Sequence, residues 1–244
     1  MISNKLHIIS LQKDFLDFDK NLEYLKNVII QHTKKETLIL APELYLSGFD
    51  YDNMSFAAKK SAQAIQDLLL AVEDTIVVLS VIAQEHDAFF NQAVVINKHQ
   101  IIHKQNKTKL FKLGEEHKHF RAGSEDDIVL FEVNRVKFAL LICFELRFKM
   151  LWKKIEGADI VLIPAKWGLL RAHHMEVLAK ALAVMNQCYV VVSSAGNKGI
   201  INRSLIISPD ADVSKENEDE YLYKLITLKE ITKMRRYIDM GDGE

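Results

Sequence analysis

The sequence predicts one α/β domain in which two sheets are flanked by helices. Short apolar runs alternate with amphipathic stretches over most of the 244 residues, a pattern typical of parallel strands joined by helices. Two pairs of apolar runs, within 89–104 and 128–143, are separated only by short polar turns and indicate hairpins. No internal repeat or low-complexity linker divides the chain, so residues 1–244 are expected to form a single domain.

The first half of the chain is expected to alternate strands and helices before it forms a hairpin. Strands are predicted at 6–11, at 37–42, where Pro42 ends the run, and at 75–82. Between them, Asp19 is expected to cap a helix, and residues 55–73 to form a second, amphipathic helix. The hairpin comprises 89–96 and 100–104, and a polar loop over 105–127 follows it.

The second half is also expected to alternate strands and helices, but here the hairpin comes first. Strands 128–133 and 136–143 flank Asn134-Arg135, and a helix is expected near 146–155. The remaining elements are predicted as a strand over 159–164, a helix over 171–187, a strand over 188–193, and late strands at 203–208 and 221–228 around the acidic loop 209–220.

Charge and hydropathy exclude several classes of partner. The net charge is −1, from 32 basic and 33 acidic residues. A general binder of nucleic acid or anionic membranes needs a basic excess, so neither partner is expected. No apolar run approaches the ~18–20 residues of a membrane span, and the first residues lack the charged-then-apolar plan of a signal peptide.

The chain has two cysteines, Cys143 and Cys188. This number predicts a protein of the reducing cytoplasm without a disulfide framework. There is no Cys-x-x-Cys motif, and the adjacent His173 and His174 face different ways on a helix and cannot easily share one ion. No metal and no other cofactor are therefore expected.

Cys143 directly follows the apolar run 138–142, after which the polarity changes at once. It is expected where a strand ends and a helix begins, at the edge where parallel α/β sheets bind ligands. A thiol there is placed to act as a nucleophile, although packing is the commonest role of a free cysteine. Cys188 precedes its apolar run, so it lies at the opposite end of its strand and is interpreted as a packing residue.

Two further residues are candidates whose local sequence is ambiguous. Glu43 follows a buried strand and Pro42, and the apolar residues after it would shield a general base. A surface glutamate that opens a loop would look the same. Lys107 lies in a polar stretch with Lys109, which usually marks a solvated face, but an inward-facing lysine would stabilise an oxyanion.

Taken together, these segments resemble the nitrilase, or carbon–nitrogen hydrolase, superfamily. In order along the chain, the matches are Ala41-Pro-Glu43-Leu44, Lys107-Thr-Lys-Leu-Phe111 and Ile142-Cys143-Phe-Glu-Leu-Arg147-Phe148, with softer matches at Phe120-Arg-Ala-Gly123 and Ile163-Pro-Ala-Lys-Trp167. The resemblance extends from the first strand to about residue 230. It implies an α-β-β-α sandwich of two mixed sheets flanked by helices.

The sequence departs from the family pattern beside the catalytic residues. Lys109 stands where a histidine is frequent, Phe144 replaces the usual tyrosine or tryptophan, and Lys149-Met150 replaces a common Pro-Glu pair. None of these changes removes a catalytic group. They alter the pocket wall and a helix surface.

The resemblance assigns a role to each candidate. Glu43 is the general base, Cys143 the nucleophile, and Lys107 stabilises the oxyanion together with the backbone N–H of Phe144. An accessory glutamate is expected to position the lysine or the substrate, with Glu116 as the best match and Glu115 as its close competitor. One carboxylate would then serve both halves of the reaction without a histidine.

The segment 116–123 is similar to the corresponding part of ω-amidase-like members, which deamidate small 2-oxo-acid amides. The leading interpretation is a cysteine-dependent hydrolase that releases ammonia from a small linear amide bearing a carboxylate, through a thioester. Arg147 or the lysines of 104–112 would bind that carboxylate, unless Arg147 forms an ion pair with Glu145 or a helix carboxylate. Phe144 and Trp167 complete the expected substrate-binding set.

Other functions remain open on the sequence alone. The main alternative is an N-carbamoyl amine or N-carbamoyl amino-acid amidohydrolase. A non-catalytic regulatory module is disfavoured by the intact Glu43–Lys107–Cys143 set, and a glutaminase domain by the lack of an attached synthetase domain. The family resemblance also implies a homodimer or higher homo-oligomer, for which the expected apolar patch, equally open to a core role, is Leu151, Trp152, Met175, Leu182 and Met185.

Overall fold

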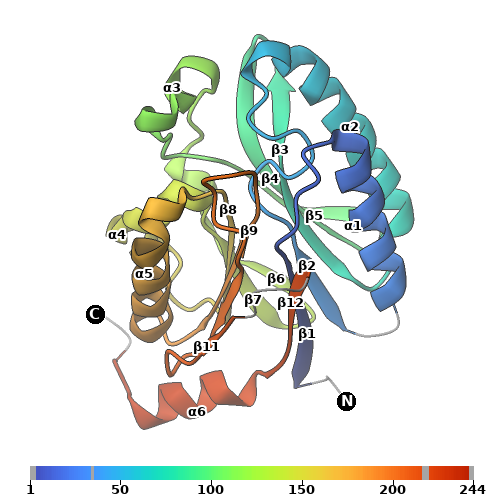
Figure 1. Cartoon of the computed structure of the whole chain (residues 1–244). Helices are drawn as coiled ribbons and strands as arrows, with labels where there is room; N and C mark the ends of the chain where they lie inside the picture. Colours follow the sequence, from blue (N-terminus) through green and yellow to red (C-terminus); the bar gives the residue numbers. More distant parts are fainter. Residues whose placement is uncertain (1–3, 34–35, 216–219, 242–244) are drawn as a thin grey trace.

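Two six-stranded sheets lie face to face, and helices cover the outer face of each (Figure 1). This computed structural model describes residues 4–33, 36–215 and 220–241. The strands are β1 (Lys5–Leu11), β2 (Thr37–Leu40), β3 (Ile76–Glu85), β4 (Ala88–Asn97), β5 (Gln100–Asn106), β6 (Phe131–Val133), β7 (Val136–Leu140), β8 (Ile160–Ala165), β9 (Tyr189–Ser194), β10 (Leu205–Ile207), β11 (Val213–Ser214) and β12 (Tyr221–Thr227). The α-helices are α1 (Phe18–His32), α2 (Met54–Ala71), α3 (Glu116–His119), α4 (Lys149–Lys154), α5 (Ala172–Met185) and α6 (Lys229–Tyr237). This arrangement confirms the expected α-β-β-α sandwich.

Each sheet has parallel strands at its centre and antiparallel strands toward its edges. The first sheet has the order β12-β1-β2-β3-β4-β5, in which β1, β2 and β3 are parallel. The second has the order β11-β10-β9-β8-β7-β6, in which β7, β8 and β9 are parallel. The antiparallel pairs β4–β5 and β6–β7 are the two hairpins expected from the sequence.

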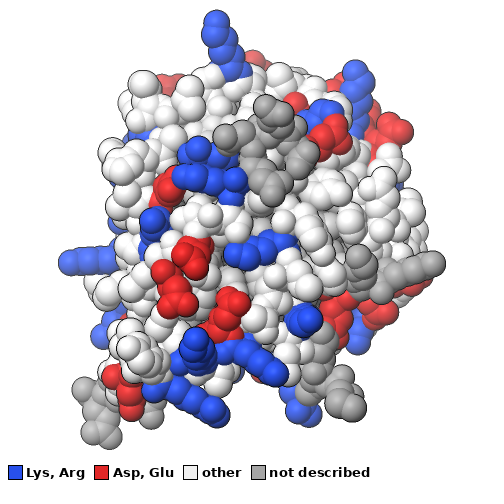
Figure 2. All heavy atoms as spheres, turned by 60° about the horizontal axis from the view of Figure 1, so that its bottom comes forward, with Lys and Arg blue, Asp and Glu red and all other residues white. Residues whose placement is uncertain are grey.

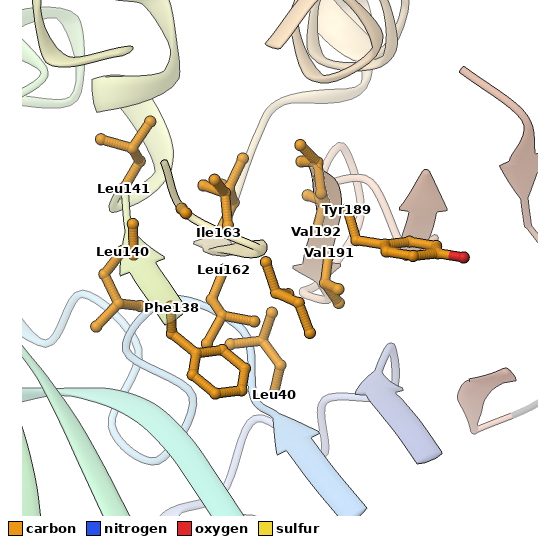
Figure 3. Packing of buried hydrophobic residues seen from close by; sticks show 14 of the residues in the cluster. Leu40, Phe138, Leu140, Leu141, Leu162, Ile163, Tyr189, Val191 and Val192 are labelled. Atoms are coloured by element: carbon orange, nitrogen blue, oxygen red, sulfur yellow. The ribbon is translucent and has the colours of Figure 1, made fainter. Parts of the chain in front are cut away.

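The central strands are buried on both faces, because one face meets the other sheet and the opposite face meets helices. Successive strand residues point to opposite sides, so Leu38 and Leu40 lie between the sheets while Ile39 packs in the cluster formed with α1 and α2. Figure 3 shows Leu40 of β2 beside Phe138 of β7 and Leu162 of β8. Burial on both sides explains why these strands appear in the sequence as continuous apolar runs.

Several boundaries differ from the prediction. Asp17, not Asp19, caps α1, and its side chain accepts a hydrogen bond from the backbone N–H of Lys20 at 2.9 Å. The strand expected over 136–143 ends at Leu140, and residues 143–147 form a 3₁₀ helix. The helix expected near 146–155 is therefore reduced to α4. Residues 216–219 of the expected acidic loop lie outside the described residues.

The helix α6 is absent from the prediction. It closes the lower end of the molecule in Figure 1, opposite α3. Its one buried residue is Ile231, and its Arg235 guanidinium donates hydrogen bonds to Asp159 Oδ1 at 3.0 Å and to the Ala158 carbonyl at 2.6 Å. Ile231 and Met234 lie three positions apart, a helical spacing that the sequence-based prediction does not use.

The surface carries a mixture of charges. On the face turned forward in Figure 2, basic and acidic side chains are interspersed. Within the described residues, none of the helices combines the length and the apolarity that a membrane crossing requires. The described part of the chain also contains no group of three or more His, Cys, Asp or Glu side chains that could hold a metal ion.

Candidate active site

Four side chains expected to be catalytic meet at one edge of the sandwich, and each comes from a different segment. Glu43 follows β2, Lys107 follows β5, Glu116 begins α3, and Cys143 follows β7. Glu43 and Lys107 are 0% exposed, so neither is the solvated surface residue that its local sequence allows. Glu116 and Cys143 are also buried. The structure therefore brings together residues that are up to 100 positions apart in the sequence (Glu43 to Cys143).

The Lys107 ammonium links two carboxylates. Its Nζ lies 2.6 Å from Glu43 Oε1 and 2.7 Å from Glu116 Oε1. The other Glu116 oxygen accepts the backbone N–H of Phe111 at 3.0 Å. Glu115 is exposed and forms an ion pair with Lys118. Glu116 is thus the one of the two candidate glutamates that contacts Lys107.

Backbone contacts hold Lys107 at this position. Its N–H donates to the Asn91 carbonyl at 2.8 Å, and its carbonyl accepts the N–H of Gly123 at 2.9 Å. A Cβ atom at position 123 would lie 2.5 Å from the Asn106 carbonyl oxygen. The two backbones approach so closely here that only glycine fits. This close approach explains the glycine at position 123, the last residue of the segment 120–123.

Glu43 is fixed through one of its two carboxylate oxygens. Oε1 accepts hydrogen bonds from Lys107 Nζ and from Asn91 Nδ2, the latter at 2.9 Å. Oε2 is buried and accepts no hydrogen bond from the described residues. The turn after Glu43 is sharp, because Leu44 has a φ of 46° and donates its N–H to Ser80 Oγ at 2.8 Å. Glu43 therefore holds one oxygen ready for a further proton.

Cys143 occupies a strained turn between β7 and α4. Its φ of 51° lies in the left-handed region, which non-glycine residues seldom adopt. The Glu145 carboxylate stabilises this turn through hydrogen bonds. Its Oε2 accepts the Ile142 N–H at 2.6 Å, and its Oε1 accepts the Thr108 N–H at 2.6 Å and the Thr108 hydroxyl at 2.7 Å. Glu145 therefore ties the Cys143 turn to the Lys107 segment.

Lys166 contacts Cys143 through its backbone. Its N–H lies 3.5 Å from Cys143 Sγ. Its side chain extends away and forms an ion pair with Asp14, which follows β1, at 2.9 Å. Both partners are largely buried. The sequence gives no signal for this pair, because the two residues are separated by 152 positions.

The charges of the cluster are coupled. Burial lowers the pKa of Lys107, but the charges of Glu43, Cys143 and Glu116 outweigh it and raise the pKa above its usual value. Burial, reinforced by the charge of Glu43, raises the pKa of Glu116 to about 7. Burial also raises the pKa of the Cys143 thiol, the Glu43 charge adds to this, and Lys107 opposes it. Cys143 is therefore a neutral thiol at pH 7 and needs a base beside it.

A small pocket includes Cys143 in its wall. Its lining consists of Phe111, Cys143, Phe144, Arg147, Lys166, Trp167 and Arg171. The three residues expected to bind substrate, Phe144, Arg147 and Trp167, all belong to this lining. Lys166 and Arg171 are not among the site residues predicted from the sequence; Lys166 occurs in the softer match 163–167 without a role, and Arg171 lies outside the matching segments.

The structure decides between alternatives that the sequence leaves open. Arg147 does not pair with Glu145 or with a helix carboxylate; its guanidinium bonds His174 Nδ1 at 3.0 Å and lies over the Trp167 ring. Of the residues expected to form an apolar surface patch, the core instead contains Leu151, Met175 and Leu182. Trp152 is half-buried, and Met185 is 58% exposed. Cys188 is buried at the start of β9, in agreement with its interpretation as a packing residue.

Comparison with known proteins identifies the family. The model of the carbon–nitrogen hydrolase family matches residues 8–236. The chain belongs to the carbon–nitrogen hydrolase family. Among curated proteins, this carbon–nitrogen hydrolase is 30% identical to a 2-oxoglutaramate amidase of Bacillus subtilis, over 91% of the chain and 90% of that protein. It is 27% identical to the omega-amidase YafV of Escherichia coli (strain K12), over 86% and 83% of the respective chains.

Solved structures of the nitrilase superfamily share the fold of this carbon–nitrogen hydrolase. A CN-hydrolase superfamily protein of Xanthomonas campestris, which carries an arsenic adduct in its active site, superposes with a TM-score of 0.85 at 20% identity and covers 98% of both chains. An amidase of Nesterenkonia, which carries the acetamide moiety of fluoroacetamide on its active-site cysteine, gives a TM-score of 0.79 at 17% identity over 96% of this chain and 94% of that chain. At these identities the structural likeness concerns the fold alone.

Proposed function

We propose that this carbon–nitrogen hydrolase is a cysteine-dependent amidase that releases ammonia from a small linear amide bearing a carboxylate. The observation that carries the proposal is the position of Lys107 Nζ, within 2.7 Å of both Glu43 and Glu116 beside the buried Cys143 thiol. Two curated relatives are named amidases of ω-amide substrates, which supports this choice within the family.

The first half of the reaction forms a thioester. Cys143 Sγ attacks the amide carbonyl carbon while its proton passes to Glu43, whose Oε2 is free of other hydrogen bonds from the described residues. The oxygen that becomes negative is met by Lys107, which has three N–H donors and gives two of them to Glu43 and Glu116. The Phe144 N–H, in the first turn of the 3₁₀ helix, supplies a second donor.

The second half returns the enzyme to its starting state. Glu43 gives its proton to the amide nitrogen, the C–N bond breaks, and ammonia leaves. A water molecule then gives a proton to Glu43 and attacks the thioester carbon. The C–S bond breaks, the acid product leaves, and Glu43 returns the proton to Cys143 Sγ. One carboxylate thus acts as base and acid in turn, and no histidine takes part.

The lining of the pocket beside Cys143 favours a substrate with a negative charge. It contains arginines but no Asp or Glu. Phe144 and Trp167 provide apolar contact for a short carbon chain. Among the lysines of 104–112, Lys107 is engaged by two carboxylates and Lys109 by Glu125, so Arg147 is the better partner for a substrate carboxylate. We also propose that this protein forms a homodimer, which its family membership supports.

An ammonia-release assay tests this function. Wild type is expected to release ammonia from succinamate and 2-oxoglutaramate. Cys143→Ala is expected to lose about 10³-fold or more of this rate, because no other group replaces the nucleophile. Cys188→Ala is the matched control, since it removes the other buried thiol far from the pocket, and it should remain active.

Two outcomes of this assay would contradict the proposal. Equal rates for wild type and Cys143→Ala would remove the cysteine mechanism. Turnover of N-carbamoyl amino acids without turnover of linear amides would favour the carbamoyl amidohydrolase instead.

A further inference from the structure

We propose that Arg171 is a specificity-determining residue that, together with Arg147, binds the substrate carboxylate at the end of the pocket remote from the scissile amide. This inference rests on the proposed amidase function and adds to it the chemistry of the substrate's second end. The substrate that follows is a short amide with a carboxylate at its other end.

Arg171 belongs to the wall of the pocket that contains Cys143. It ends the 3₁₀ helix Leu169–Arg171, which leads directly into α5. Its side chain is half-buried, and its guanidinium carbon lies 5.3 Å from the centroid of the Phe111 ring, another pocket residue. Its guanidinium forms no hydrogen bond or ion pair with any residue that the structure describes. An arginine is therefore held in place by an aromatic surface while its donors stay free.

Gly168 leaves the space that this guanidinium occupies. Its φ of −65° and ψ of 141° suit any residue, so the backbone does not require glycine. A Cβ atom at Gly168 would, however, lie 3.0 Å from Arg171 Nη2. The absence of a side chain at position 168 thus permits the observed position of Arg171.

Arg147 lies on a second aromatic wall of the same pocket. Its guanidinium carbon is 4.7 Å from the Trp167 ring centroid, and one of its nitrogens bonds His174 Nδ1 at 3.0 Å. The third cation of the lining, Lys166, is neutralised by Asp14. Neither arginine has a carboxylate partner among the described residues.

Arg147 is exposed and Arg171 half-buried, and an anion in the pocket that both line is attracted by both positive charges. Guanidinium groups present planar, paired donors that match a carboxylate. Because Cys143 lies in the same pocket, an anion held by the arginines belongs to the molecule whose amide is attacked. A neutral amide of the same length would leave both charges without a partner.

A pair of matched substrates tests the proposal. Succinamate and butyramide differ in that a carboxylate of the first is a methyl group in the second. Arg171→Met is expected to raise KM for succinamate by about 10- to 100-fold, with kcat changed by less than about 3-fold, and to leave KM for butyramide unchanged. Arg171→Lys should have an intermediate effect, because it keeps the charge but loses the paired donors.

Two further variants separate specificity from general damage. Gly168→Ala should raise KM for succinamate alone, since the added methyl group displaces the Arg171 guanidinium. Arg236→Met, which removes an exposed arginine of α6, is the control and should behave as wild type. A rise in KM for both substrates in Arg171→Met, or for neither, would overturn the proposal.

A binding measurement keeps this inference distinct from the proposed function. Calorimetry of succinate with the Cys143→Ala protein needs no turnover. The additional Arg171→Met substitution is expected to weaken succinate binding by about 10-fold or more. Unchanged binding overturns the role of Arg171. If wild type hydrolyses neither amide but the arginine dependence of succinate binding persists, the proposed function fails and the anion site stands.

Discussion

Lys107 carries the only positive charge in direct contact with Glu43 and Glu116 among the described residues. One ammonium cannot fully compensate two buried carboxylates. The consequence is visible in Glu116, whose pKa rises to about 7 through burial and the charge of Glu43, although Lys107 opposes the shift. Glu116 therefore changes protonation near neutral pH.

Because the pKa of Glu116 is raised, we expect the unfolding free energy to depend on pH. A carboxyl group whose pKa is higher in the folded than in the unfolded chain stabilises the fold while it is protonated. This contribution is fully present below about 4.5, the usual value, and is lost as the pH rises through about 7. Urea unfolding of wild type should therefore show a fall in unfolding free energy between pH 5 and pH 8 that Glu116→Gln lacks.

Glu115→Gln is the matched control for this experiment, because Glu115 precedes Glu116 but is exposed and paired with Lys118. It should keep the pH dependence of wild type. An identical fall in Glu116→Gln and wild type would show that another group is responsible. Glu116→Gln should also lower kcat/KM, since Lys107 loses a charged partner.

Individual residues show where sequence-based prediction succeeds and where it fails. Glu43, Lys107 and Cys143 each have an ordinary local explanation, and only their order along the chain indicates a common site. Arg171 and Lys166 have no such signal, because Lys166 acts through its backbone and through an ion pair with the distant Asp14. The contacts of Arg171 with Phe111 likewise depend on tertiary structure.

At the scale of elements, the turn after β7 depends on the segment after β5. Glu145 is 0% exposed and makes three hydrogen bonds, one to Ile142 in its own turn and two to Thr108, the residue after Lys107. Burial raises its pKa, and these hydrogen bonds oppose the rise. Glu145 thereby fixes the Cys143 turn and the Lys107 segment relative to each other.

Replacing Glu145 should damage both stability and activity. In Glu145→Gln one acceptor oxygen becomes an NH₂ group, which faces N–H donors and leaves them without a partner. The expected loss is about 1–3 kcal/mol of unfolding free energy, together with a fall in kcat because Cys143 and Lys107 are less well aligned. Chemical denaturation and steady-state kinetics measure the two effects.

Glu132→Gln provides the comparison, since Glu132 is an exposed residue of β6. It should leave both quantities near the wild-type values. Wild-type stability and kcat in Glu145→Gln would contradict the bridging role.

The end of β7 illustrates why the hydrophobic pattern does not predict where a strand ends. The apolar run continues through Leu141 and Ile142, which are 0% exposed, yet the strand ends at Leu140. An apolar run indicates only that its residues are buried. Here the buried residues continue beyond the strand into the turn that contains Cys143. The left-handed conformation of Cys143 is likewise invisible to a prediction based on hydrophobic pattern.

For the whole molecule, polar contacts join the two sheets. Ser10 Oγ donates to the Val192 carbonyl at 3.0 Å, and Ser193 and Ser204 donate to the Leu11 carbonyl at 2.7 and 2.9 Å. These contacts join residues more than 180 positions apart, so the sequence predicts the two layers from alternation and hairpins but not how they are joined. The small serine side chains allow the backbones of β1 and β9 to approach.

The helix α6 stabilises the end of the sandwich remote from α3 (Figure 1). Ile231 is buried in the cluster between the sheets. Ile231→Ala is expected to lower the unfolding free energy by about 2–4 kcal/mol, as large-to-small core changes do, while KM for succinamate stays unchanged because α6 does not line the pocket. Lys233→Ala, an exposed change on the same helix, serves as the control. A changed KM with unchanged stability would contradict this assignment.

In the proposed mechanism, Cys143 carries the acyl group during turnover. Rapid acid quench of the enzyme with saturating succinamate, followed by peptide mass spectrometry, tests it most directly. We expect a succinyl thioester on the peptide that contains Cys143, labile to hydroxylamine, present in Cys188→Ala and absent in Cys143→Ala. An acyl group on another residue, or turnover of succinamate by Cys143→Ala at the wild-type rate, would contradict it.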